Sequence, residues 1–389
     1  MKTATITWIT YNNFGTLLQA YALQKYITML GHENELISDS IILKEFQKKK
    51  AASKAAPVGP IKPVSRKERI KNLIVNPRRI GRVITARVNK KKYQFPYYGM
   101  QSRCEEFKKS ELSIRDGCSG DMLQTLNGDY DAFICGSDQI WSVFPDIFNP
   151  YYYLDFSAKK KIAYAPSLGS DMIPETIGQK IKVLLSDFSA ISVRESVSAK
   201  QLETLTGNSV EWVCDPTILH DMDFWHTFAE GTEKPKGRYL LCYFLENRPW
   251  YFEYAKRIAK ARHLKIKLIP NKWDYISSEN VLTYAVGPKE FVGLFENADF
   301  ILTDSYHGSI FSLIFEKDFL YLQRFADDDP CSQNIRVDSL FTYLDIDDII
   351  VDNTMHTRHN ESLDYRHISE LLRDYREKSR NYLQRCLTS

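Results

Sequence analysis

Short apolar runs and apolar residues at helical spacing alternate along most of the chain. Residues 3–10 alternate between apolar and polar side chains, which predicts a strand. Residues 16–30 place apolar side chains on one face at helical spacing, and Gly31 ends the predicted helix. A second strand is expected at 35–38, so the chain opens with a strand, a helix and a strand.

This alternation is interrupted and then returns in both halves of the chain. Before a polar linker at 229–237, strands are expected at 132–135, 162–165, 190–193 and 210–214, with helices at 177–188 and 195–205. After the linker, strands are expected at 238–245, 264–270, 300–303 and 319–322, with helices at 250–262, 288–298, 309–316 and 366–385. Such alternation predicts parallel sheets covered by helices, and hence an α/β protein whose two Rossmann-like domains face a cleft.

The length of 389 residues agrees with about two to three domains at ~150 residues each. We expect an N-terminal α/β domain at 1–230, which carries an insertion at 44–110, and a C-terminal α/β domain at 238–360. A separate final helix is expected at 365–389.

The net charge of +3 hides an uneven distribution. Residues 44–93 contain 17 Lys or Arg and only 2 Asp or Glu, whereas the rest of the chain has 35 basic and 47 acidic residues. This basic segment is either a solvated helical insertion or a patch for an anionic partner. Residues 47–92 include no aromatic side chain, so no nucleic-acid partner is expected.

Several classes of protein are excluded by missing patterns. No stretch approaches the ~18 apolar residues of a membrane-spanning helix, and the first ten residues lack the apolar core of a signal peptide, so a soluble cytoplasmic protein is expected. The seven cysteines include no CxxC and the histidines no HExxH, so neither a disulfide scaffold nor a metal site is expected. The motifs GxGxxG, GxxxxGK[ST] and GxSxG are also missing.

The turn after the expected strand at 132–135 carries Asp138 and Trp141 in the segment GSDQIW. Ligands of open α/β sheets bind beyond the carboxyl ends of the strands. Asp138 is therefore a candidate to accept a proton from a sugar hydroxyl, and Trp141 a candidate to stack on a sugar ring. The alternative is that Asp138 only caps the following turn.

Two further turns after strands carry charged residues. Arg194 follows the strand at 190–193, where its guanidinium can hold a phosphate or a carboxylate through two parallel hydrogen bonds. The alternative is an ion pair that braces the two halves of the protein. Asp215 precedes Pro216 after the strand at 210–214, and we interpret it as the cap of a turn.

The segment DSYHGS is the most informative one. It joins the strand at 300–303 to a helix that is expected to start near Gly308. The N-terminus of a helix presents free backbone N–H groups and therefore attracts anions, and Ser305 and Ser309 would add hydroxyl donors. His307 stands at this position with a side chain that can transfer protons near neutral pH.

Five segments of the chain together resemble the polysaccharide pyruvyl transferase family. They are NNFGTLLQAYALQ, GSDQIW, SVRESVSAKQL, CDPTIL and NADFILTDSYHGSIFSLIFEKDF, and their order and spacing agree with the family from residue 1 to about 345. The chain departs from the family in its long basic segment at 44–93 and at Tyr306, where the family usually has Phe.

The resemblance implies a fold like that of the two-domain GT-B glycosyltransferases, with the final helix crossing back to the N-terminal domain. It also implies transfer of pyruvate from phosphoenolpyruvate to a sugar as a ketal, with phosphoenolpyruvate as a co-substrate and no other cofactor. The functional His, Arg and Asp of the family fall on His307, Arg194 and Asp138, which are therefore expected to be catalytic.

The resemblance divides the expected contacts between the two domains. The donor, on the C-terminal side, is expected to contact Arg194, Ser305, His307, Gly308 and Ser309. The sugar, on the N-terminal side, is expected to contact Asn13, Asp138, Gln139 and Trp141.

Capsule and cell-wall sugars are often built on lipid diphosphate carriers. The resemblance therefore leads us to expect an acceptor linked to undecaprenyl diphosphate and peripheral contact of the basic segment with the inner membrane face. Two alternatives stay open: a GT-B glycosyltransferase that uses a nucleotide sugar, and a binding protein that keeps the cleft without turnover.

Overall fold

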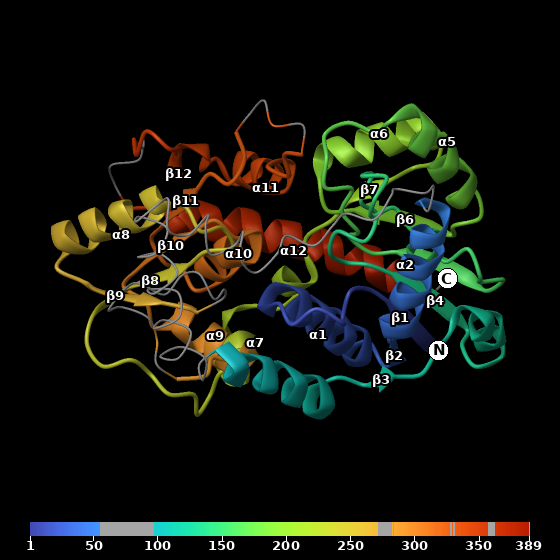
Figure 1. The fold of residues 1–389 in the computed structure, drawn as a ribbon, viewed down its shortest axis with the longest axis horizontal. Helices are drawn as coiled ribbons and strands as arrows, with labels where there is room; N and C mark the ends of the chain where they lie inside the picture. The colour runs from blue at the N-terminus through green and yellow to red at the C-terminus, as the bar shows by residue number, and fades with distance from the viewer. Residues whose placement is uncertain are drawn as a thin grey trace, which may run out of the picture.

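The computed structural model describes residues 1–54, 97–270, 282, 284–326, 329, 331–356 and 362–388 (Figure 1). Two parallel sheets, each with helices packed around it, lie side by side, and the chain passes from one to the other near residue 230. This architecture confirms the α/β fold class with two Rossmann-like units. Most of the basic segment at 44–93 lies outside the described residues, so its expected helices are not described here.

The N-terminal sheet has seven parallel strands in the order β3-β2-β1-β4-β5-β6-β7, so β1 stands near its centre. The strands are β1 (Lys2–Ile6), β2 (Glu33–Ile37), β3 (Ile114–Arg115), β4 (Ala132–Cys135), β5 (Lys160–Ala163), β6 (Ala190–Val193) and β7 (Glu211–Trp212). The helices of this half are α1 (Phe14–Met29), α2 (Ser40–Lys54), a helix at 97–111, α5 (Glu175–Leu184), α6 (Ser196–Thr206) and α7 (Met222–Phe228), with 3-10 turns η1 (Gly120–Gly128), η2 (Pro150–Tyr153) and η3 (Pro216–Leu219).

The C-terminal sheet has five parallel strands in the order β12-β11-β10-β8-β9. The strands are β8 (Tyr239–Tyr243), β9 (Lys265–Leu268), β10 (Phe300–Thr303), β11 (Phe319–Leu322) and β12 (Ile350–Val351). The helices are α8 (Pro249–Arg262), α9 (Pro288–Glu296), α10 (Tyr306–Ile314), α11 (Ile335–Leu344) and α12 (Tyr365–Thr388), with the 3-10 turn η5 (Asp347–Ile349).

The central strands are short and buried on both faces, which is why the sequence shows them as apolar runs. The bounds expected for β4, β6, β10 and β11 agree with the structure. The expected strand at 3–10 is too long, since β1 ends at Ile6 and its continuation turns into the loop before α1. Helix α10 begins three residues earlier than expected, because Ser305 accepts a hydrogen bond from Gly308 N and caps it.

Helix α12 contacts both halves of the molecule. Near its start, Tyr365 donates to the Lys317 carbonyl of the C-terminal half. Further along, Tyr375 donates to the Val213 carbonyl at 2.8 Å and Tyr382 to the Ala163 carbonyl at 2.9 Å, both in the N-terminal half. Figure 1 shows α12, in red, running between the two sheets. The helix therefore fixes how the two halves are placed.

Aromatic side chains make a second connection between the halves, at the start of α1. The Phe14 ring stacks on Phe291 of α9 at a centroid distance of 4.8 Å, and it also contacts Tyr243 at the end of β8. Phe14 is 1% exposed. One aromatic side chain from the N-terminal half is thus buried in the core of the C-terminal half.

Replacing Phe14 tests how much this contact contributes to the free energy of unfolding. We expect Phe14→Ala to lower the free energy of unfolding by about 3–5 kcal/mol, because a buried cavity would replace the ring. Phe14→Leu keeps most of the volume and is expected to cost less than about 1.5 kcal/mol. Urea unfolding of the two variants and the wild type measures both values. Equal stability of the two variants would contradict an interdomain packing role.

Candidate functional site

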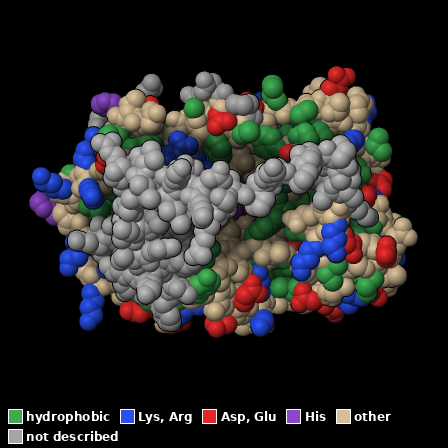
Figure 2. Space-filling view, in the orientation of Figure 1, with side chains coloured by type: hydrophobic (Ala, Val, Ile, Leu, Met, Phe, Trp, Pro, Cys, Tyr) green, Lys and Arg blue, Asp and Glu red, His purple; other side chains and the backbone are tan. Residues whose placement is uncertain are grey.

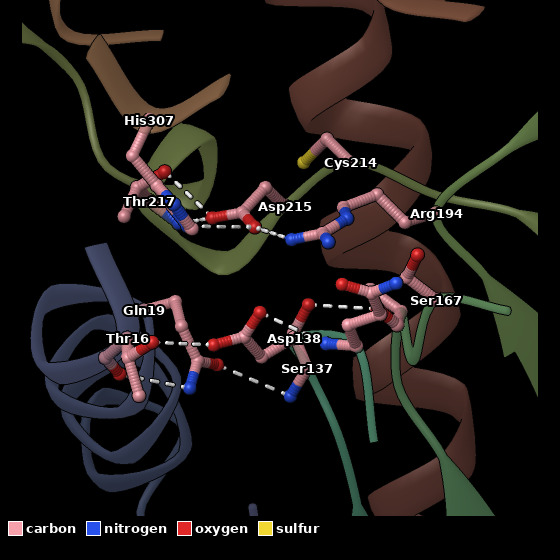
Figure 3. Close-up of polar contacts among 12 residues, drawn as sticks. Thr16, Gln19, Ser137, Asp138, Ser167, Arg194, Cys214, Asp215, Thr217 and His307 are labelled. Carbon is pink, nitrogen blue, oxygen red and sulfur yellow. Dashed lines mark hydrogen bonds and ion pairs between the residues drawn. The ribbon is translucent and has the colours of Figure 1, made fainter. Parts of the chain in front are cut away.

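A buried ion pair between Arg194 and Asp215 lies at the centre of the molecule. Arg194 follows β6 and Asp215 follows β7, so the two neighbouring strands bring their side chains together at the carboxyl edge of the N-terminal sheet. The Arg194 Nη1 atom lies 2.7 Å from Asp215 Oδ2, and neither side chain is exposed. Figure 3 shows Arg194 beside Asp215, with Asp138 below them.

The guanidinium of Arg194 is only partly used by the protein. Its Nε and Nη2 atoms have no hydrogen-bond partner, although Glu195 Oε1 lies 3.5 Å from Nε. The guanidinium carbon lies 4.5 Å from the centroid of the Tyr306 ring, a cation–π contact that holds it in place. An unpartnered buried donor is costly, so these two nitrogens are suited to an anionic ligand.

Asp215 links the arginine to the histidine. Its Oδ1 atom accepts hydrogen bonds from Thr217 N at 3.0 Å and Thr217 Oγ1 at 2.7 Å, as a turn cap does. Its Oδ2 atom lies 3.5 Å from His307 Nε2, an ion-pair distance. Burial alone would raise the pKa of Asp215, but His307, Arg194 and Thr217 together hold it below its ordinary value. The carboxylate of Asp215 therefore stays ionised, with the Arg194 guanidinium and the Thr217 hydroxyl beside it.

The imidazole of His307 is packed against the backbone at the start of α1. A Cβ atom at Gly15 would lie 2.2 Å from His307 Nδ1, so only glycine leaves space for the ring at this position. The His307 side chain is 9% exposed, and its Nε2 atom has no hydrogen-bond partner. Its ring thus lies at the contact between the two halves and beside the ion pair.

Asp138 lies across from Asp215, after β4 (Figure 3). Its Oδ2 atom accepts a hydrogen bond from Thr16 Oγ1 of α1 at 2.7 Å, and its Oδ1 atom accepts one from Gln139 N at 2.9 Å. The residue is 5% exposed. The carboxylate is therefore fixed in orientation, and its charge acts on Arg194 and on Arg336.

Two more arginines bring positive charge to the same region. Arg336 lies in the first turn of α11 and Arg324 follows β11. Burial, followed by the positive charges of Arg194 and Arg324, lowers the pKa of Arg336 to about 10. The guanidinium groups of Arg194 and Arg324 are thus close enough to Arg336 to perturb its pKa. Three guanidinium groups in one region create a positive potential, which favours an anionic ligand.

Glu195 partly offsets this positive charge. Its side chain is not exposed, and burial raises its pKa although Arg194, Ser167 and Arg336 act in the opposite direction. Its two carboxylate oxygens have no hydrogen-bond partner, and its contact with Arg194 is the ion pair at 3.5 Å.

The start of α10 differs from the expected anion site. Ser305 Oγ accepts from Gly308 N, Ser309 N donates to the Ser305 carbonyl, and the Ser309 hydroxyl donates to that same carbonyl. The backbone donor of Gly308 and both donors of Ser309 are therefore engaged within the helix, whereas the Ser305 hydroxyl accepts and keeps its own proton to donate. Local capping thus competes with the expected contacts of Gly308 and Ser309, and the donor-binding role of these three residues stays a prediction.

Trp141 is also wrongly predicted as a sugar-stacking residue. Its ring is fully buried, stacks on Tyr153 at a centroid distance of 4.9 Å, and donates from Nε1 to the Tyr152 carbonyl. Asn13 is the N-cap of α1, where its side chain accepts from Thr16 N. Gln139 is buried beside Asp138, and its Nε2 atom has no partner.

The structure adds residues to the candidate site that the sequence does not point to. Asp215 was interpreted as a cap only, yet it also binds Arg194. Glu195, Arg324 and Arg336 were not considered. Arg324 follows a strand, like the residues that were found, so its position was a usable signal. Arg336 lies on a helix that the hydrophobic pattern did not reveal.

Within the ranges given above, no cluster of three or more His, Cys, Asp or Glu side chains is arranged to hold a metal ion. Over the same residues, no helix combines enough length and apolarity to span a bilayer.

The fold and the buried centre define a two-domain α/β protein with a buried cluster of arginines and carboxylates between its halves. The sequence model of the polysaccharide pyruvyl transferase family matches residues 13–324. The chain therefore belongs to this family and is a transferase of polysaccharide biosynthesis. No curated protein is a significant sequence match to the chain.

Solved structures resemble the chain only distantly. A candidate UDP-N-acetylglucosamine 2-epimerase from Listeria monocytogenes has a TM-score of 0.49 at 10% identity, covering 99% of this chain and 90% of that one. MnaA with UDP from S. aureus has a TM-score of 0.46 at 12% identity, covering 98% and 90%. A glycosyltransferase from Rickettsia africae has a TM-score of 0.44 at 10% identity, covering 98% and 93%. At these scores, the fold class rests on the two sheets of this chain itself.

A methyl group at position 15 tests the packing of the histidine. We expect Gly15→Ala to destabilise the protein by about 1–3 kcal/mol and to shift the His307 ring resonances, because the new Cβ atom overlaps the ring. Gly128→Ala is the matched control, since nothing lies within 4 Å of a Cβ atom there. Chemical unfolding and NMR of the imidazole protons measure the two effects. Identical behaviour of both variants would disprove the close packing.

Asp304 provides a pH-dependent feature beside the site. It follows β10, and its carboxylate accepts hydrogen bonds from the backbone N–H groups of Leu245 at 2.5 Å and Glu246 at 2.9 Å. Burial nevertheless raises the pKa of Asp304 from 3.8 to about 6. The folded protein therefore binds this proton more tightly than the unfolded chain does, and its contribution to stability is lost as the pH rises through 6.

We expect the stability of the wild type relative to Asp304→Asn to be highest below the ordinary pKa of 3.8 and to fall by about 3 kcal/mol as the pH rises past 6. Urea unfolding from pH 3.5 to 7.5 measures this difference. Asp299→Asn is the control: burial would raise the pKa of Asp299, but hydrogen bonds from Arg238 and Tyr239 lower it, so its contribution is lost as the pH falls. A pH-independent difference for Asp304→Asn would show that the carboxyl is not perturbed.

Proposed function

We propose that the protein transfers the pyruvyl group of phosphoenolpyruvate to two hydroxyls of a sugar, forms a cyclic ketal and releases phosphate. One observation carries this proposal: the buried guanidinium of Arg194 has two nitrogens without partners and lies between a histidine and a carboxylate. Membership of the pyruvyl transferase family supports the class of reaction.

The charge of the site suits the donor. Phosphoenolpyruvate carries a phosphate and a carboxylate, and Arg194 can bind one of them through Nε and Nη2. Asp215 occupies Nη1 and so orients the free nitrogens away from itself. Arg324 and Arg336 add positive charge for the second anionic group. Arg194 is in this proposal a donor-binding catalytic residue.

The reaction needs three proton transfers, of which the first two balance each other and the third goes to the phosphate. A proton added to the methylene carbon of phosphoenolpyruvate leaves an oxocarbenium-like centre at the adjacent carbon. One sugar hydroxyl attacks that carbon and loses its proton. A second hydroxyl then attacks as the bond to the phosphate oxygen breaks, and its proton leaves with the phosphate. The sum is phosphoenolpyruvate and a diol on one side, and ketal and phosphate on the other.

His307 is placed to carry these protons. Its Nε2 atom has no hydrogen-bond partner, and Asp215 Oδ2 lies 3.5 Å from it, where the carboxylate can orient the ring. A positioned acid or base of this kind contributes about 10²–10⁴-fold to a rate. We assign His307 the role of general acid and base.

Asp138 is the group for the sugar. Thr16 and the Gln139 backbone fix its carboxylate, which leaves it able to accept a hydrogen bond from a substrate hydroxyl. Its buried position near Arg194 would bring that hydroxyl to the donor. Gln139, with its unpartnered Nε2 atom, is a second polar contact on this side.

The acceptor is proposed to be part of a polysaccharide precursor carried on a lipid diphosphate. The support is the basic segment at 44–93, with its 17 Lys or Arg residues, which suits an anionic carrier or the inner face of an anionic membrane. A cytoplasmic site of action follows from this proposal.

Mass spectrometry of glycosides incubated with phosphoenolpyruvate tests the reaction. We expect a product that has gained one pyruvylidene group, and phosphate release that requires both substrates. Arg194→Lys keeps the charge but loses the planar fork, so the KM for phosphoenolpyruvate is expected to rise about 10- to 100-fold, the equivalent of one charge-assisted hydrogen bond. Arg366→Lys, at a side chain 97% exposed, is the control.

Two results would overturn the proposal. Turnover with a nucleotide sugar and none with phosphoenolpyruvate would identify a glycosyltransferase instead. An unchanged KM for phosphoenolpyruvate in Arg194→Lys would remove the arginine from the donor site.

A further inference from the structure

A cavity opens between the two halves, outside the buried centre. It has a volume of about 610 Å³ and lies between the start of α6 with the preceding loop at 170–172 and the start of α11. We refer to this space as the α6–α11 cleft. It is lined by residues 170–172, 196 and 197 on one side and by Asp329, Ser332, Asn334, Ile335, Asp338, Ser339 and Thr342 on the other. Its size is within the range of ligand-binding pockets. Figure 2 shows that the face in view is hollowed between the two halves of the molecule.

The cleft borders the proposed reaction centre. Ser196, which lines it, begins α6 and is separated from Arg194 by Glu195 alone. On the opposite wall, Arg336 follows the lining residue Ile335, and its charge acts on Arg194 and Asp138. A ligand in the cleft would therefore have one end beside the residues that hold the donor.

Hydrogen-bonding groups in the cleft are numerous and partly unused. Hydroxyl groups line it at Ser170, Ser196, Ser332, Ser339 and Thr342. Asn334, also in the lining, is 9% exposed; its nitrogen donates to the Phe325 carbonyl, but its Oδ1 atom has no partner. Neither α6 nor α11 has a side-chain hydrogen bond at its N-cap, so backbone donors are also available at both walls.

The charged residues of the lining indicate which class of ligand the cleft can bind. Three carboxylates, those of Asp171, Asp329 and Asp338, line the cleft, and the described lining residues include no Lys or Arg. Like charges repel, so a diphosphate is disfavoured here, whereas a neutral polyhydroxyl ligand can use both donors and acceptors. Met172 and Val197, which are 72% and 43% exposed, add apolar surface for the C–H face of a sugar ring.

We propose that the α6–α11 cleft is the binding subsite for an uncharged sugar of the acceptor, and that it extends away from the reacting hydroxyls held near Asp138. The acceptor role rests on the proposed function, because only a sugar-modifying enzyme needs such a subsite beside its donor site. The cleft then selects neutral glycans and leaves any diphosphate carrier to a different surface.

Saturation-transfer NMR with neutral p-nitrophenyl glycosides, hexosides and N-acetylhexosaminides, tests sugar binding without phosphoenolpyruvate. We expect the wild type to transfer saturation to the sugar protons. In Val197→Arg the larger side chain fills part of the cleft, so the saturation-transfer signal is expected to fall at least fivefold. Val183→Arg is the matched control, because Val183 is a 72% exposed residue of α5 outside the lining. Asp171→Asn keeps the shape of the side chain and is expected to weaken binding by a smaller factor.

The outcomes separate this inference from the proposed function. Absence of saturation transfer with the wild type, or equal transfer with Val197→Arg and Val183→Arg, would overturn the sugar subsite. Tighter binding of a sugar phosphate than of the neutral glycoside would overturn the selection for uncharged sugars. Calorimetry measures the binding of phosphoenolpyruvate separately and reports on the donor site. If the wild type binds the neutral sugar but not phosphoenolpyruvate, the proposed reaction is contradicted and the sugar subsite is not.

Discussion

The arrangement of the site depends on burying one positive charge where two halves of the protein meet. Removing a guanidinium from water is costly, and the protein offsets this cost only in part, through Asp215, the Tyr306 ring and the nearby Glu195. The Nε and Nη2 atoms make no hydrogen bond, so the desolvation cost of these two donors is not offset. A bound anion would complete this set of contacts, and on this ground we propose that the centre is a ligand site and not only a brace for the fold.

The other features keep this charge in place. Parallel strands β6 and β7 bring Arg194 and Asp215 to the same edge of the sheet, and α12 connects that edge to the C-terminal half. His307 enters from the second half, and Gly15 gives it the space to do so. Because each half supplies part of the site, its geometry depends on the interdomain contacts of α12 and Phe14 as much as on the residues that would touch substrate.

Electrostatics divide the space between the halves into two regions. Arg194, Arg324 and Arg336 concentrate positive charge at the centre, whereas three carboxylates line the neighbouring cleft. A small dianion and a neutral polyhydroxyl ligand are thus favoured at adjacent positions. This division matches a reaction that joins a charged donor to an uncharged sugar.

The sequence by itself determined the fold class and most of the buried strands, and it placed Asp138 and Arg194 after strands and His307 at the start of a helix. Buried parallel strands are continuous apolar runs, and their carboxyl ends mark where polar side chains gather, so both can be found from local pattern. Only the tertiary structure decided that Trp141 is core and that the serines of α10 cap their own helix. It also decided that Asp215 pairs with Arg194 and that Arg336 approaches from the other half, because contacts between residues far apart in the chain depend on how the two sheets are placed.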